Sequence, residues 1–271
     1  MKRKASENDP TRLKHHSLAL QSILSNRSEN STVSITCVHH PAKLDPSTEE
    51  RTGGEIGGTD KTVHDFFENI WQRHPKLYKR KKKCDNGIQC SSTPSCPLDE
   101  TLSMGWNGVI KMIDQSCKNC NKATVDSDTH SFHLRPLFLQ NQTPLQQDEI
   151  QMKYSSNPYA AYLDGCSIIQ NHAEYFSIPL SNLCLDLQKT FPHVYCNTYL
   201  TPPNSSTVKA HADDRDVFVI QIEGRKKWKV YSEVPIPYPY SHEQVGKNVI
   251  PVPSSVTLTK IVTINHHSML Q

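Results

Sequence analysis

His211 and Asp213 are the side chains in this sequence best suited to bind a metal. In an extended backbone, residues i and i+2 point to one face about 6.6 Å apart, so this imidazole and carboxylate can converge on one cation. One His and one Asp, with a second His from a later strand, form the ligand set of non-heme Fe(II) centres, which leave positions open for a cosubstrate and O2. The spacing alone fits a surface pair at the start of a strand equally well.

The residues that follow predict the elements that hold this pair. Residues 217–222 are apolar at nearly every position, which is typical of a strand covered on both faces. The next run, 225–229, is cationic except at Trp228. On composition alone Lys226 is a solvated charge, but its alternation with Trp228 and Val230 places it on the inner face. The order predicts a metal-binding strand followed by a hairpin.

Composition bounds the class of protein. The 271 residues include 35% hydrophobic side chains at a mean hydropathy of -0.60, which is low for a chain that is all core, so part of it is expected to be unfolded. The net charge of +3 is too small to indicate nucleic-acid binding by itself. Nine cysteines without an apolar N-terminal segment favour a reducing compartment. No apolar run approaches the length of about 18 residues that a membrane span needs.

Two of three predicted regions precede the metal-binding pair. Residues 1–60 are rich in Ser, Thr, Asn, Glu and Lys and are expected to form a disordered polar tail. Residues 61–156 are expected to be a helical segment with a Cys-containing insertion. Its helix is predicted because apolar side chains recur every three or four positions from Val63 to Trp71, and Pro75 then ends it.

The insertion holds potential zinc ligands. Cys117-x-x-Cys120 has ligand spacing, but a structural site needs four ligands, and no second pair here has the usual short loop. We therefore expect a loop whose thiols stay reduced, with a small zinc knot as the alternative. The potential ligands are Cys84, Cys90, Cys96, Cys117, Cys120, His130 and His133.

The third region, residues 157–271, mixes helical and strand patterns. Its predicted elements, in order, are a short helix (157–164), a buried strand (166–169) after a turn at Gly165, a helix (173–190) broken at Pro179, and a β-rich run (194–200) ended by Pro202. Together with residues 217–222 they predict a mainly β, α+β domain with flanking helices.

Several of these segments together resemble the JmjC ribosomal oxygenases, a group of bifunctional lysine-specific demethylases and histidyl-hydroxylases. The similarity extends from about residue 157 to residue 255, and a His-x-Asp followed by Gly-x-Lys-x-Trp is far more specific than His-x-Asp alone. The segments that carry it are residues 162–166, 192–195 and 197–203, His211-x-Asp213 with residues 214–223, and Gly224-x-Lys226-x-Trp228.

The resemblance implies a fold, a chemistry and roles for particular residues. The fold would be a double-stranded β-helix of the cupin or JmjC type. The activity would be that of a 2-oxoglutarate- and Fe(II)-dependent dioxygenase, with His211 and Asp213 as iron ligands and Lys226 bound to the distal carboxylate of 2-oxoglutarate. Asn197 matches a position that lines the cosubstrate pocket, although a buried amide that satisfies backbone groups is an equal alternative. Asp214 is expected to hold hydrogen bonds rather than metal.

The C-terminal segment departs from the family pattern. The family has a distal histidine ligand after a Pro-Gly-Asp turn, whereas residues 257–271 contain His266 and His267 without such a turn. Either histidine is a candidate for the third ligand, but the segment is interpreted as a foreign or truncated end, which would leave the domain C-terminally incomplete. With two protein ligands, iron binding and turnover are expected to be weak or absent.

Partners and location follow from the same resemblance. It implies a protein substrate, either a ribosomal protein or a histone tail, together with O2, a homodimer in the full-length family, and a place in the nucleus or nucleolus. The basic runs 2–4 and 79–83 fit nuclear import, contacts with nucleic-acid phosphates, or plain solvated charge, so direct nucleic-acid binding stays open. Two alternatives remain: a non-catalytic cupin-like module that binds chromatin or ribosomes, and an interaction protein built on the zinc knot.

Overall fold

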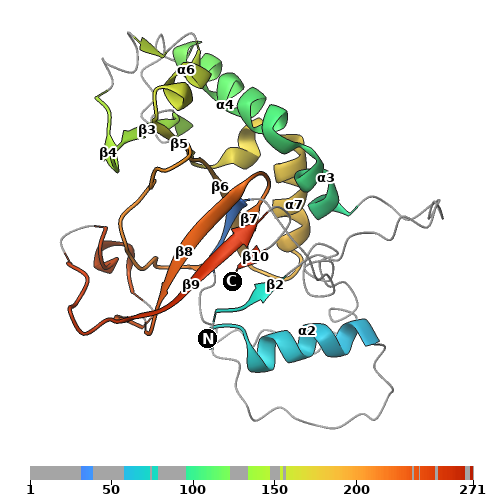
Figure 1. The fold of residues 1–271 in the computed structure, drawn as a ribbon. Coiled ribbons are helices and arrows are strands. Elements are labelled where there is room, and N and C mark those ends of the chain that lie inside the picture. Colours follow the sequence, from blue (N-terminus) through green and yellow to red (C-terminus); the bar gives the residue numbers. More distant parts are fainter. Residues whose placement is uncertain are drawn as a thin grey trace, which may run out of the picture.

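Two antiparallel sheets and several helices make up the described part of the protein (Figure 1). The computed structural model describes residues 32–38, 58–73, 75–78, 96–122, 134–146, 153–154, 157–233, 235–237, 239–247, 250–265 and 269–270. The larger sheet has eight strands in the spatial order β2 (Leu77–Tyr78), β10 (Met269–Leu270), β7 (Asp216–Gln221), β1 (Thr32–Val38), β6 (His193–Leu200), β5 (Ser167–Gln170), β3 (Leu137–Gln140) and β4 (Thr143–Pro144). The second sheet pairs β8 (Arg225–Tyr231) with β9 (Leu258–Asn265).

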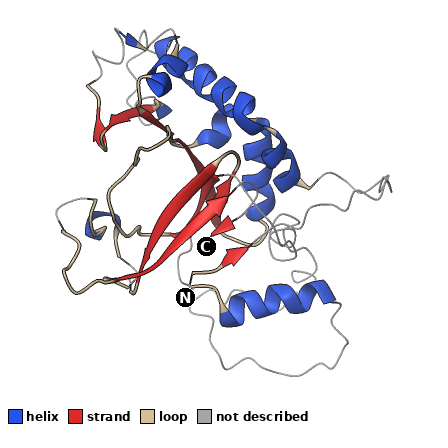
Figure 2. Cartoon of the chain, viewed as in Figure 1, coloured by secondary structure: helices blue, strands red, loops and turns tan. Residues whose placement is uncertain are grey.

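The helices lie around these strands, as Figure 2 shows. They are α2 (Gly58–Asn69), α3 (Pro97–Ser103), α4 (Gly105–Lys122), α6 (Pro158–Leu163), η4 (Ala173–Phe176), α7 (Ile178–Leu187) and η5 (Ser241–Glu243). Together with the sheets they make a mixed α+β fold, the broad class that the sequence predicted. Among the described helices, none is long and apolar enough to cross a membrane.

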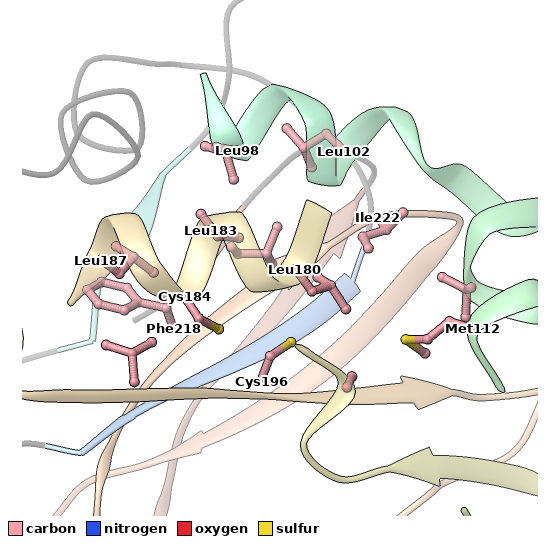
Figure 3. Close-up of a cluster of buried hydrophobic side chains, with 14 of the residues drawn as sticks. Leu98, Leu102, Met112, Leu180, Leu183, Cys184, Leu187, Cys196, Phe218 and Ile222 are labelled. Carbon is pink, nitrogen blue, oxygen red and sulfur yellow. The ribbon is translucent and has the colours of Figure 1, made fainter. Parts of the chain in front are cut away.

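The main core lies between α7 and the larger sheet. Figure 3 shows Leu180, Leu183 and Leu187 of α7 beside Phe218 of β7 and Cys196 of β6. All five are at most 4% exposed. Burying a large apolar side chain contributes about 1.5–3 kcal/mol, so this layer is the principal support of the sheet.

An aromatic cluster fastens α2 to the same core. Phe66 stacks on Phe218 with ring centroids 6.2 Å apart, and Trp71 lies 4.9 Å from Phe191. The helix predicted from Val63 to Trp71 is thus confirmed, and its apolar face covers the sheet.

Strand β7 is covered on both faces, as the sequence predicted. Phe218 and Ile220 join the core on the helix side. On the opposite face, Val219 packs with Val262 and Ile264 of β9 in a second, smaller core. The two sheets therefore lie on each other through β7 and β9, and α7 and β9 cover opposite faces of β7.

The predicted hairpin is wrong. β7 pairs with β1 and β10, whereas β8 pairs with β9 over its whole length. Gly224 connects β7 to β8 with a φ of 71°, a left-handed conformation that glycine adopts without strain. The chain thus turns from one sheet into the other, which strand propensity alone does not reveal.

Both end regions contribute strands. Residues 32–38, expected within a polar tail, form β1 between β7 and β6, where Ser34 pairs with Asn197 and with Val219. Near the other end, β9 and β10 pair with β8, β7 and β2, and the interpretation of residues 257–271 as a foreign or truncated end stays a prediction. Long-range pairing, rather than local composition, fixes these three strands in the sheets.

The Cys-containing insertion is helical where it is described, not a loop. It includes α3 and α4, and Cys117 of α4 is 9% exposed within the main core. Cys84, Cys90, His130 and His133 lie outside the described residues. The zinc knot therefore stays a prediction.

The other local predictions for 157–200 are confirmed. α6 ends before Gly165, which has a φ of 85°, and β5 follows. The break near Pro179 separates η4 from α7, with Pro179 in the first turn of α7. β6 then covers the β-rich run.

Candidate active site

His211 and Asp213 lie in the loop that leads into β7, not on a strand as the sequence suggested. The segment around Val245 holds this loop in place, because the backbone N–H of Ala212 donates to the carbonyl of Val245 at 2.9 Å. Gly246 permits this close approach: a Cβ there would lie 2.3 Å from the carbonyl oxygen of Ala210. A loop can hold the pair because this second segment packs against it.

The two side chains converge as a metal site requires. His211 Nδ1 lies 2.7 Å from the carbonyl oxygen of Lys209. Because a carbonyl only accepts, Nδ1 carries the proton and Nε2 keeps its lone pair. Nε2 lies 3.8 Å from Asp213 Oδ2, and the side chains are 20% and 30% exposed. Two donors thus point at one partly sheltered position.

Lys247 was missed by sequence reasoning. Its ammonium donates to Asp213 Oδ1, from the same segment that holds the loop. Nothing in the sequence marks a lysine 34 positions away as a neighbour of this carboxylate. A cation at this carboxylate neutralises the charge that would attract a metal ion.

The neighbouring carboxylate serves the loop. Asp214 accepts a hydrogen bond from Ser241 at 2.6 Å and lies 3.4 Å from Arg215. Arg215 in turn donates to the hydroxyl of Tyr195 at 2.6 Å. Asp214 therefore holds the loop against η5 and β6, the supporting role that the sequence suggested.

Lys226 points inward from β8, as the alternation predicted. Its ammonium donates to the hydroxyls of Thr201 at 2.9 Å and Thr207 at 3.4 Å. The rings of Tyr199 and Trp228 lie 5.8 and 5.5 Å from Nζ. Burial lowers the pKa of Lys226 to about 8.

This ammonium lacks a carboxylate partner. Within the described part of the chain, no ion pair involves Lys226. Thr207 is 2% exposed and hydrogen bonds to Thr201 at 2.6 Å and to Ser167 at 3.4 Å, so the hydroxyls are fixed in place. A buried charge with ordered hydroxyls but no counter-charge is suited to receive an anion. Thr207 carries no sequence signal that would have revealed it.

Tyr199 connects the two halves of the site. Its ring contacts Lys226, and its pKa is raised first by burial and then by the negative charge of Asp213. Asn197, two residues earlier on the same face of β6, accepts from the backbone N–H of His172 at 3.2 Å. Asn197 thus satisfies a backbone group, which was the alternative to a cosubstrate contact, and its contact with a cosubstrate stays a prediction.

No third ligand completes the metal site within the described residues. There, no group of three His, Cys, Asp or Glu side chains is placed to hold a metal. His266 and His267 lie outside the described residues, so their role stays a prediction.

The donor set fits the groups that the resemblance implies. One imidazole and one carboxylate would hold Fe(II) and leave positions for a chelating keto acid and O2. Lys226 and its threonines would hold the distal carboxylate of 2-oxoglutarate, whose charge offsets the buried ammonium.

The segment from η4 into β9 is similar to a known family. Residues 173–262, about a third of the chain, match the family model described as the JmjC domain. The match includes His211, Asp213, Lys226 and Asn197, so the matched segment holds every described candidate residue. Its cupin-type fold agrees with the fold class that the sequence predicted.

Several proteins named as bifunctional lysine-specific demethylases and histidyl-hydroxylases are similar to this chain. A bifunctional lysine-specific demethylase and histidyl-hydroxylase NO66 from Drosophila mojavensis is 49% identical over 173 residues, covering 63% of this chain and 17% of the relative. The protein of that name from Drosophila persimilis is 45% identical over 146 residues, covering 49% of this chain and 19% of the relative. The protein of that name from Aedes aegypti is 29% identical over 174 residues, covering 63% of this chain and 23% of the relative. The chain therefore spans less than a quarter of each of these relatives.

Replacing Lys226 by Met should stabilise the protein at neutral pH. The folded state binds the proton of Lys226 more weakly than the unfolded state, because the pKa falls from 10.5 to about 8. This charge therefore destabilises the fold below pH 8, and the penalty fades between about pH 8 and pH 10.5. Urea unfolding should show Lys226→Met more stable by up to about 3 kcal/mol at pH 7, with the difference lost near pH 10.5.

Lys227→Met is the matched control, because Lys227 is exposed on the other face of β8. Its unfolding free energy should differ from that of the wild type by less than about 0.5 kcal/mol at either pH. A destabilised Lys226→Met at pH 7 would contradict the buried-charge argument.

Replacing Lys247 by Met should tighten metal binding. Asp213 would no longer be paired with an ammonium, and a partly exposed ion pair contributes up to about 1 kcal/mol, which corresponds to about fivefold in affinity. Calorimetric titration with Mn(II), a redox-stable substitute for Fe(II), measures the change. Lys209→Met removes an exposed charge from the same loop and should leave the affinity unchanged. Equal affinities for the two variants would refute a competing role for Lys247.

Proposed function

We propose that this chain is an Fe(II)- and 2-oxoglutarate-dependent protein oxygenase. The observation that carries the proposal is the placement of two groups about Tyr199: the His211–Asp213 donor pair and the buried ammonium of Lys226. Both lie in the segment that matches the JmjC domain. A metal-binding pair beside an anion pocket is the arrangement that such chemistry needs.

Each residue has a task in this proposal. His211 and Asp213 hold the metal through Nε2 and a carboxylate oxygen, and the hydrogen bond to Lys209 keeps His211 in the required tautomer. Lys226, with Thr201 and Thr207, binds and orients the distal carboxylate of 2-oxoglutarate. When bound, the iron would activate O2, with one oxygen atom passing to a C–H bond of the substrate and the other to 2-oxoglutarate, which would lose CO2 to become succinate.

Tyr199 and Trp228 form the walls of the anion pocket. Tyr199 belongs to β6 and Trp228 to β8, and both rings face the ammonium of Lys226. Apolar walls exclude water and strengthen the charge interaction between the lysine and a carboxylate. They therefore favour the keto-diacid over water in the pocket.

The proposed substrate is a protein side chain. The names of the relatives describe lysine demethylation and histidine hydroxylation, and both reactions begin with oxidation of a C–H bond. We extend the proposal to a histidine of a ribosomal protein or an N-methyl-lysine of a histone tail, with a nuclear or nucleolar location. Homodimer formation is a further part of this proposal, taken from the sequence resemblance.

A second candidate is a non-catalytic module that binds chromatin or ribosomes. It is favoured by the two-donor metal site of the described residues and by the ion pair between Lys247 and Asp213. Such a module would retain the pocket shape without turning over 2-oxoglutarate. Binding of Fe(II) and release of succinate separate the two candidates.

Succinate release tests the proposed activity. The purified chain, supplied with Fe(II), 2-oxoglutarate and a histidine-containing ribosomal peptide or an N-methyl-lysine histone peptide, should release succinate slowly. Slow turnover is expected because the described residues supply two protein ligands, which would hold iron weakly. Asp213→Ala should lower the rate at least about tenfold. Mass spectrometry of the peptides identifies which side chain gains oxygen or loses a methyl group.

Asp214→Asn is the matched control, because it changes the next carboxylate, which bonds Ser241 rather than facing His211. It should keep most of the activity. The His266→Ala, His267→Ala double variant tests the third-ligand candidates: robust turnover that survives it would contradict the ligand argument. Peptide binding without Fe(II) binding would instead establish the non-catalytic module.

A further inference from the structure

The outer face of β8 is a row of cations. Arg225, Lys227 and Lys229 are all exposed, and they alternate with Lys226 and Trp228, which face the pocket. Residues i, i+2 and i+4 of a strand lie on one face at intervals of about 6.6 Å. We call the outer face of the β8–β9 pair the basic ribbon.

The partner strand leaves this charge uncompensated. Across the ribbon, Lys227 pairs with Thr263 and Lys229 pairs with Ile261, which is 56% exposed. Neither β8 nor β9 contains an acidic residue. Among the described residues, none of the ion pairs involves Arg225, Lys227 or Lys229.

The ribbon's position leaves this face open. Val262 and Ile264 pack inward on β7, and α7 covers the far side of β7, so the helix layer lies away from the ribbon (Figure 1). Three like charges in a row repel one another, which costs free energy that folding does not recover. An anionic partner with regularly spaced charges would remove that repulsion.

We propose that the basic ribbon binds the phosphate backbone of single-stranded RNA. Arg and Lys side chains are the main phosphate contacts of proteins, and Thr hydroxyls add to them. The even spacing lets successive cations reach successive phosphates of one strand. Ile261 adds an exposed apolar surface beside Lys229 for a sugar or a base. This activity is separate from the oxygenase proposal, because Lys226 faces the opposite side of β8.

The salt dependence of binding to a fluorescently labelled oligouridylate tests the ribbon in the full chain. Three phosphate contacts on a single strand give a slope of log K against log salt of about -2. The triple variant Arg225→Gln, Lys227→Gln, Lys229→Gln should bind at least about tenfold more weakly at 0.1 M salt, and its slope should approach zero. Circular dichroism checks that the variant is folded.

The matched control removes the same charge elsewhere, with Lys111→Gln, Lys118→Gln and Lys153→Gln, all exposed. It should change the affinity less than about twofold. Lys226→Met should also keep RNA binding while it loses 2-oxoglutarate binding, so a failed oxygenase proposal leaves this test intact. An equal loss in the control triple variant, or unchanged binding by the ribbon variant, would overturn the proposal.

Competitors decide the class of partner. Polyglutamate and vesicles of anionic lipid offer negative charge without a nucleic-acid backbone. At equal concentrations of negative charge, oligouridylate should bind the basic ribbon more tightly than polyglutamate or the vesicles, and should displace both. Tighter ribbon-dependent binding to polyglutamate or to the vesicles would refute an RNA partner.

Discussion

A buried ammonium with no carboxylate partner in the described part of the chain is the constraint on which the site depends. Lys226 gives up water for two hydroxyls and two aromatic rings, and its pKa falls to about 8 as a result. Such a charge is costly to the folded chain alone. A bound dianion would offset the cost, so the same residue weakens the free protein and favours the complex. Stability and binding are opposed at this position.

Strand β8 meets this constraint through its alternation. Lys226 and Trp228 face the pocket, while Lys227 faces solvent, so adjacent cations have opposite environments. A shift of one residue against β9 would expose Trp228 and move Lys227 into the pocket. The pairing of Lys226 with Ile264, which is buried on β7, fixes the register. The pocket and the basic ribbon are thus two faces of one pairing.

The spacing of apolar residues along the chain predicted the features that depend on neighbours in sequence. The apolar face from Val63 to Trp71 identified α2, and the alternation about Lys226 identified its inward direction. Strand pairing was beyond such patterns. Strand β1 lies in a polar context, and only its partners β6 and β7 explain its place in the sheet. The hairpin prediction failed for the same reason, because β8 pairs with β9 and not with β7, its neighbour in sequence.

The site shows the same division. The His-x-Asp spacing located two donors, yet the loop that carries them depends on Gly246, whose missing side chain admits the backbone of residues 210–211. Lys247 and Thr207 come from loops distant in sequence, and no spacing rule connects them to Asp213 or Lys226. The sequence was sufficient to name the residues that could bind a metal or an anion. The residues that contact them could be identified only from the fold.

Lys226 should lose its proton near pH 8 in the free protein, and NMR observes that proton directly. The 13Cε signal of Lys226, assigned by its absence in Lys226→Arg, should titrate in the free protein near pH 8, where burial places its pKa. Addition of 2-oxoglutarate together with Zn(II), used here in place of Mn(II), should move that midpoint upward by at least about one pH unit. The reason is that a nearby carboxylate favours the charged form of Lys226. A midpoint at the ordinary value of 10.5, unchanged by 2-oxoglutarate, would contradict the account.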